Sequence, residues 1–305
     1  MSLRDIKTKI RSVDRTRKVT KAMETVSAVK MRKAQLRALS GRPYARAALS
    51  ILERLSPSLA SLAHPLTVVR PVRRAALIVV TSDKGLCGVL NAAVLKESER
   101  VIASLGLERA NIDIYAFGRK AAEYFTRRDY TLKSKFENIS DDVSPADLAE
   151  VSREVVRSFE DGRVDEVRVV YTNFKSTFEQ ESRSHTLLPL SLPEFQSIVA
   201  GIVPQKGAFA HGETAPAPHF YTVEPSADEV LGTLLPRLTT VFVYHALLES
   251  KASEHSARMV AMKNASDKSR DLSKALTRVF NKTRQAVITR EVSEIVGGIE
   301  AMARN

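Results

Sequence analysis

The first forty residues carry apolar side chains at the spacing that is typical of a long helix. The alternation of three and four residues begins with Leu3, Ile6, Ile10 and Val13. After the polar stretch DRTRK it resumes in a shifted phase at Val19, Met23 and Val26. No glycine or proline intervenes before Gly41 and Pro43, so we expect a helix of about 38 residues, about 57 Å long, or about 80 Å if it continues to Arg54. Such a length favours a coiled coil over a helix inside a compact core.

The end of the chain repeats the pattern over a greater length. The alternation runs through Leu238, Val241, His245, Leu248, Ala252, His255, Met259 and Met262, and continues after a skip with Leu272, Leu276 and Val279. No proline follows Pro236, and the only glycines after it are Gly297 and Gly298. Residues 237–305 as one helix would reach about 100 Å. Small or polar residues at Ala252, His255, Ser266 and Ser269 predict a seam weaker than Leu or Ile would give.

The middle of the chain alternates strand and helix patterns. Strands are expected at 75–80, 111–117 and 164–171, with a further one near 184–190, and helices at 92–104, 119–127 and 146–160. This alternation predicts a small parallel or mixed, Rossmann-like α/β sheet. The stretch 201–218, rich in Gly, Pro and Ala, is expected to be a loop or mobile insertion.

The expected architecture is an α/β domain inserted between two long helices that pair as an antiparallel coiled coil. We assign residues 1–60 to the N-terminal helix, 75–225 to the α/β domain and 226–305 to the C-terminal helix. Because the second helix is longer, 20 Å or more of it should lack a partner in its own chain. Its apolar stripe must then face water or be covered by another molecule.

Composition narrows the class of protein. The chain has 305 residues, 44% hydrophobic and 27% charged, and a single cysteine, which favours a reducing compartment. We see no apolar run of about 18 residues and no export signal, so we expect no membrane span. The net charge of +12 is concentrated in residues 1–46, where fourteen Lys and Arg stand against three acids. That excess suits nucleic acid, a membrane surface, an acidic protein partner or simply a solvated helix face.

The turn TSDKGLCGVLN, residues 81–91, lies between a strand and a helix, where α/β proteins often bind phosphates or place a nucleophile. The phosphate-loop pattern GxxxxGK[ST] and the dinucleotide pattern GxGxxG are both absent, because Gly85 and Gly88 are three apart and Lys84 precedes both. Cys87 has no histidine nearby in sequence, which favours a buried, inert thiol over a nucleophile.

We therefore interpret the turn as structural. Gly85 and Gly88 would supply backbone angles closed to other residues, and Asp83 and Asn91 would cap the turn and the start of the next helix. The six histidines are scattered and form no HExxH pattern. No paired-carboxylate or Ser/His/Asp site emerges, so we expect no catalytic site, cofactor or metal.

Three segments in order resemble the gamma subunit of F-type ATP synthase. They are DIKTKIRSVDRTRKVTKAMETVSAVKMRKAQ, SDKGLCGVLN and ESKASEHSARMVAMKNASDKSRDLSKALTRVFNKTRQAVITREVSEIVGGIEA, and the resemblance spans essentially the whole chain. It implies a central rotor stalk whose two helices form a coiled coil inside a ring of three alpha and three beta subunits. The α/β domain would contact the epsilon subunit and the c-subunit ring, and nucleotide chemistry would belong to beta.

The resemblance also implies roles for single residues. It places Met23, Arg258, Gln285, Thr289, Glu294 and the turn holding Cys87 at the contact between shaft and stator, and Tyr221 and Glu224 at the foot that touches the c ring. The family pattern begins at Leu3, which leaves no room for an organelle transit peptide. We therefore expect a bacterial protein, peripheral on the cytoplasmic side of the inner membrane.

A second hypothesis comes from a different class. A basic coiled-coil protein could bind nucleic acid through residues 1–46, and that binding would be salt-sensitive and independent of protein partners.

Overall fold

The computed structural model describes residues 2–40, 47, 51, 64–191, 193–194, 196 and 226–303. The chain forms two compact units. The helical unit comprises residues 1–26 and 259–305, and the sheet unit comprises residues 27–258. The two are described separately below.

The sheet unit contains a five-stranded mixed sheet in the order β3-β2-β1-β4-β5. Four strands are parallel, and β5 runs antiparallel to β4. The mixed α/β sheet predicted from the sequence is thus confirmed. The strands are β1 (Ala75–Val80), β2 (Ile112–Phe117), β3 (Thr131–Phe136), β4 (Glu166–Phe174) and β5 (Gln180–Leu188).

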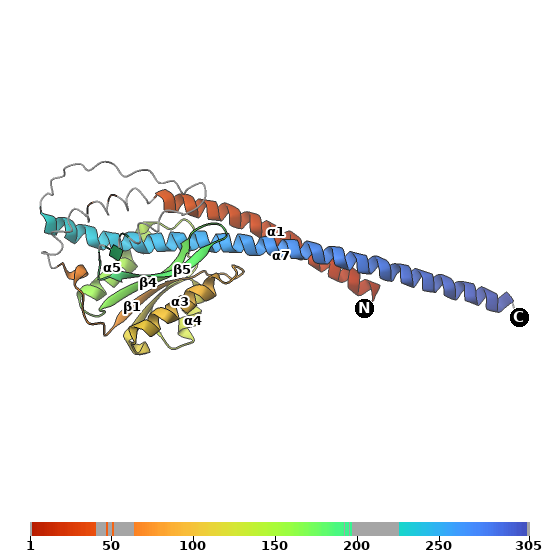
Figure 1. Cartoon of the computed structure of the whole chain (residues 1–305), viewed down its shortest axis with the longest axis horizontal. Helices are drawn as coiled ribbons and strands as arrows, with labels where there is room; N and C mark the ends of the chain where they lie inside the picture. Colours follow the sequence, from red (N-terminus) through yellow and green to blue (C-terminus); the bar gives the residue numbers. More distant parts are fainter. Residues whose placement is uncertain are drawn as a thin grey trace. The chain divides into compact units, whose positions relative to one another are not determined.

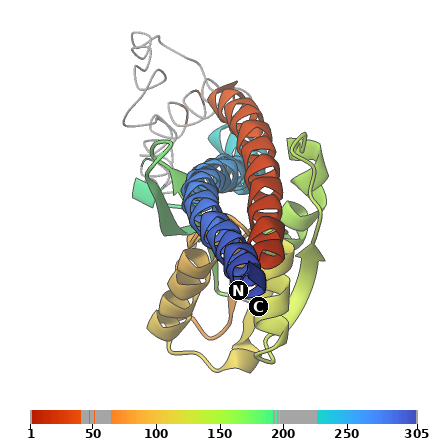
Figure 2. The same ribbon diagram turned by 90° about the vertical axis from the view of Figure 1, so that its right-hand side faces the viewer.

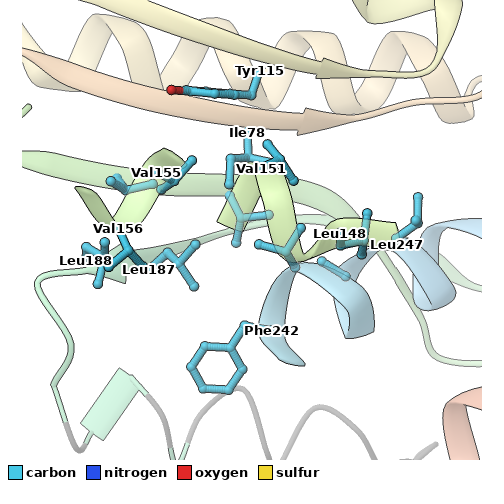
Figure 3. Close-up of a cluster of buried hydrophobic side chains, with 14 of the residues drawn as sticks. Ile78, Tyr115, Leu148, Val151, Val155, Val156, Leu187, Leu188, Phe242 and Leu247 are labelled. Carbon is cyan, nitrogen blue, oxygen red and sulfur yellow. The ribbon is translucent and has the colours of Figure 1, made fainter. Parts of the chain in front are cut away.

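Helices cover both faces of the sheet (Figure 1). The alternating side chains of β1 divide between two cores, since Leu77 and Val79 pack with α3 and α4, while Ile78 and Val80 pack with α5 and α7. Figure 3 shows the second core, where Ile78 and Tyr115 of the sheet lie near side chains of α5 and α7. The covering helices are α3 (Leu90–Leu105), α4 (Arg119–Thr126), α5 (Ala149–Glu160), which follows the short η3 (Pro145–Leu148), and α7 (Ala227–Ala303).

The expected elements of the middle region are present with ends shifted by a few residues, but β3 was missed. Its sequence TLKSKF alternates exposed and half-buried positions, and two of its six residues are lysines. It lies at the edge of the sheet, where charged residues are common because they discourage pairing with other chains. An edge strand of this kind lacks the apolar run by which the buried strands were found.

Helix α7 begins at Ala227, ten residues before the helix expected from the apolar spacing and one residue after the start of the C-terminal segment assigned at 226, and it contains Pro236. By length and composition, its part from Glu229 to Ile299 is the one helix among the described residues that could cross a membrane. One 18-residue window there has a mean hydropathy of 1.3, and half of it is buried inside the protein. Leu235, Leu238 and Phe242 of this helix belong to the core on the sheet, so packing accounts for its apolar composition.

In the helical unit the start of α1 (Leu3–Ser40) runs alongside α7 (Figures 1 and 2). The Ser273 hydroxyl donates to Asp14 Oδ1 at 3.1 Å, which fixes the register of the antiparallel pair. The antiparallel pairing of the two long helices is confirmed.

The seam between these helices keeps its phase, contrary to our expectation. Val19 and Val26 are 58% and 55% exposed, and Leu272 and Val279 are also exposed. The buried seam continues with the same three-four spacing, but several of its positions are small or polar residues. A search for regularly spaced apolar residues does not find these positions. On α1 the buried or half-buried members of the seam are Leu3, Ile6, Ile10, Val13, Arg17, Thr20 and Glu24, and on α7 they are Met262, Ser266, Ser269, Ser273, Leu276, Phe280, Thr283 and Val287.

Beyond Val287 every side chain to Ile299 is exposed. Residues 288–303 of α7, which we call the tip, extend about 24 Å past the start of α1 (Figure 1). The expected unpaired end is therefore present. Its exposed apolar residues again follow a three-four alternation, at Ile288, Val292, Ile295, Ile299 and Met302.

Candidate interaction surfaces

The turn at residues 81–91 is held by a compact set of hydrogen bonds around Asn91. Its side chain accepts from Ser82 N at 3.0 Å, and its Nδ2 donates to Ser82 Oγ at 2.8 Å and to Cys87 Sγ at 3.3 Å. Cys87 is 2% exposed, as expected of a structural thiol. Because Asn91 is also the second residue of α3, the turn and the helix are fixed together.

Three details of this turn differ from prediction. Asn91 does not cap α3, because the N-cap residue of that helix is Val89, which has no side-chain cap hydrogen bond. The left-handed backbone angles belong to Leu86 and Gly88, each with φ of 63°, and not to Gly85. Asp83 does not cap α3, because its Oδ1 accepts from Arg119 N at 3.0 Å and so caps α4. The turn presents two apolar side chains outward, since Leu86 and Val89 are 62% and 79% exposed, and the side chain of Lys84 is exposed beside them.

Helix α7 completes the hydrogen bonding of β4 where β1 has ended. The ladder between β1 and β4 stops at Val170, which leaves the next residues of β4 without a strand on that side. There, Phe174 N donates to Glu249 Oε2 at 2.8 Å and Thr172 N donates to Ser250 Oγ at 3.1 Å, while Ser253 Oγ donates to Thr172 O at 3.3 Å. Buried polar side chains of α7 thus form the hydrogen bonds to the β4 backbone that a neighbouring strand would otherwise form.

Arg258 joins the same helix to the turn. Its guanidinium donates to the carbonyl oxygens of Lys84 at 3.2 Å and Gly85 at 3.3 to 3.4 Å, and it pairs with Glu254 at 2.8 Å. Arg258 and Glu254 are both buried. Two backbone carbonyls and one carboxylate satisfy a charge that would be costly to bury alone.

These contacts place α7 at the edge of the sheet where related sheets bind ligands. In such sheets the strand order reverses at one strand, and ligands bind outside the carboxyl ends of the strands there. Here β1 is that strand, with β2 on one side and β4 on the other. Residues 249–258 of α7 contact the segments that follow β1 and end β4, so the chain's own helix lies at that position. Among the described residues, no three or more His, Cys, Asp or Glu are grouped to hold a metal ion.

The structure places the expected site residues in three settings. Arg258 and the turn holding Cys87 are brought together in the sheet unit. In the helical unit, Met23 is half-buried, and Gln285, Thr289 and Glu294 are exposed. Tyr221 and Glu224 lie outside the described residues.

Sequence reasoning missed two features of these surfaces. The first is an exposed apolar stripe on α1, formed by Val19, Val26, Val29 and Leu36. The second is the set of buried polar contacts that Glu249, Ser250 and Ser253 make. The letters ESKASEHS show the polar residues themselves, but their partners lie more than seventy residues away in sequence.

Comparison with known proteins gives one consistent family. The chain matches the ATP synthase family over residues 2–302. It is 37% identical over 300 residues to the ATP synthase gamma chain of Heliobacterium modesticaldum, covering 98% of this chain and 99% of that one. It is 42% identical to that of Kineococcus radiotolerans, covering 99% and 97%.

Solved structures agree. The chain resembles the central stalk of the Tetrahymena thermophila mitochondrial ATP synthase with a TM-score of 0.60 and 27% identity, covering 81% of this chain and 99% of that one. Its fold also matches a chain of the Euglena gracilis mitochondrial ATP synthase with a TM-score of 0.62, covering 98% and 94%. Nothing in these comparisons supports a nucleic-acid-binding protein. The chain belongs to the gamma-subunit family of ATP synthase, the central stalk of the rotary enzyme.

Proposed function

We propose that this stalk transmits rotation of a c-subunit ring to a catalytic ring of three alpha and three beta subunits, and so couples proton translocation to ATP synthesis or hydrolysis. The observation that carries the proposal is the tip, an exposed helix with an apolar stripe and no partner among the described residues. Five exposed apolar side chains on one face of a helix mark a contact with another protein. A sleeve formed by the alpha and beta subunits would cover it.

The chain itself contributes no catalytic step in this proposal. Its sheet has α7 at the position where related sheets bind ligands, and the turn after β1 lacks the lysine that follows the second glycine of a phosphate loop. Residues 1–60 and 226–305 would act as the shaft, and residues 75–225 as the body that contacts the epsilon subunit and the c ring. The protein would be peripheral on the cytoplasmic side of a bacterial inner membrane, attached through the membrane sector of the complex.

Single residues receive roles in the same proposal. The exposed side chains of Gln285, Thr289 and Glu294 suit direct contact with the stator, as does the apolar stripe beside Met23. Arg258 is buried, so we assign it the task of fixing the turn at residues 81–91 against α7. The turn would meet the stator through Leu86 and Val89 rather than through the Cys87 thiol. Tyr221 and Glu224 remain proposed contacts of the c ring.

Polar substitutions in the tip test this proposal. Ile295→Gln with Ile299→Gln should leave the free energy of unfolding of the isolated chain nearly unchanged, because both side chains are exposed. The same double variant should lower the retention of the chain in the assembled complex. Leu276→Gln is the matched control, because Leu276 lies in the seam and its loss should destabilise the isolated chain. Normal retention of the double variant, or loss of its isolated stability, would contradict the proposal.

A further inference from the structure

A short connection in the sheet unit reaches both long helices. Residues 137–144 link β3 to η3, and apolar side chains anchor this segment on either side of its centre. Val143 belongs to the core that α5 and α7 share, and Ile139 packs against that core. The backbone around Asp141 is therefore held in place from both directions.

The carboxylate of Asp141 bonds to groups on two helices at once. Lys30 of α1 lies 2.7 Å from Oδ2. On α7, His255 Nε2 lies 3.0 Å and Lys251 Nζ 3.8 Å from Oδ1. Lys251 also donates to Ile139 O at 2.8 Å.

Arg37 adds a second attachment of α1 to the same segment. Its guanidinium donates to the carbonyl oxygen of Asp141 and to the carboxylate of Asp142. The contacts thus join α1, α7 and the connection after β3.

The Asp141 carboxylate is the acidic group that Lys30, Lys251 and His255 share. Lys251 is largely buried, and without the carboxylate it and Lys30 would bring two positive charges together with no shared counter-ion. The buried His255 would lose its hydrogen-bond partner on this side of the ring. The hydrogen bond from His255 and the neighbouring lysines hold the pKa of Asp141 well below its ordinary value, against the opposing effect of burial. The carboxylate is therefore ionised throughout the neutral range.

We propose that Asp141 is a positioning residue of the rotor, which fastens α1 and α7 to the body so that torque passes between them without slip. The proposal rests on the rotor function proposed above. This positioning role differs from a purely structural one, because the contacts of Asp141 must stay formed while torque acts on the two helices. Loss of one attachment should then loosen one helix and reduce coupling before it unfolds the chain.

Hydrogen exchange of the assembled complex tests the attachment itself. Asp141→Asn should speed amide exchange about tenfold in residues 27–38 and in residues 249–258. Lys30→Gln should speed it in residues 27–38 alone, since Lys30 serves only the α1 side. Because Lys30 is half-exposed, this second variant should fold even if Asp141→Asn does not. Asp141→Glu should restore slow exchange, and Asp161→Asn is the control, because Asp161 pairs with Arg163 two residues away in an exposed loop.

Coupling of the same complexes separates positioning from stability. Asp141→Asn and Lys30→Gln should reduce the number of protons pumped per ATP hydrolysed, with hydrolysis close to wild type, and Asp161→Asn should not. Unchanged exchange in residues 27–38, or coupling equal to that of Asp161→Asn, would overturn the proposal. A wild-type complex that hydrolyses ATP without turning this chain would instead overturn the rotor function, and the exchange result would still decide whether Asp141 fastens the helices.

Discussion

Gly118 is the described glycine of the sheet unit with the least room for a side chain. Its φ is +92°, and a Cβ there would lie 2.2 Å from the carbonyl oxygen of Thr81. Gly118→Ala should therefore lower the free energy of unfolding by roughly 2–4 kcal/mol, from backbone strain and steric overlap together. Chemical denaturation of the full chain measures this. Gly85→Ala is the control, because its Cβ would enter open space, and an equal loss in both variants would refute the explanation.

Asp141 gives a pH dependence with a definite sign. Its pKa is lower in the folded chain than the ordinary value of 3.8, so its stabilising effect is fully present above 3.8 and is lost as the pH falls below it. Wild type should exceed Asp141→Asn in stability by about 1–2 kcal/mol at neutral pH, discounted because the carboxylate is partly exposed. The difference should shrink on acidification. Denaturation curves across the acid range would show this, and a difference independent of pH would contradict it.

Predictions for single residues succeeded where the chemistry of the side chain itself determines whether the residue is buried. Cys87 was expected to be buried and inert in a turn, and it is buried. The helix that Asp83 caps could not be predicted. Its partner Arg119 begins α4 and lies 36 residues later in the sequence, whereas α3 follows Asp83 directly.

At the scale of elements, small and polar residues limited the prediction. The seam of α1 passes through Thr20 and Ser27, which are buried, while Val19 and Val26 point away from it. An apolar pattern alone assigns the valines to the seam. Their exposure is instead consistent with a second surface of α1 that a partner would cover.

The contact between α7 and β4 permits a test at the same scale. Ser250→Ala should destabilise the chain by about 1–3 kcal/mol, because it leaves the buried Thr172 N–H without an acceptor. Ser293→Ala on the exposed tip of the same helix should change the stability little. Thermal or chemical unfolding compares them. Equal stability of the two variants would show that the hydroxyl of Ser250 does not replace a strand.

For the whole molecule, the order of elements and the antiparallel helix pair could be predicted, because both follow from repeated spacing along the chain. The resemblance to the gamma family also came from whole segments in order. What the sequence could not show is that α7 packs at the edge of the sheet where related sheets bind ligands. That outcome depends on Glu249, Ser250, Ser253 and Arg258 meeting backbone groups far away in sequence.

The central claim is that this chain turns inside a stationary ring, and single-molecule rotation tests it most directly. The complex would be fixed through its beta subunits, and a probe would be attached to a cysteine introduced at the exposed residue Arg163 of the body, with Cys87→Ser to direct the label. Addition of Mg-ATP should produce rotation in one direction, with three pauses per turn, because in the proposed complex three beta subunits would surround the shaft. ATP hydrolysis at the wild-type rate with a stationary probe would contradict the account.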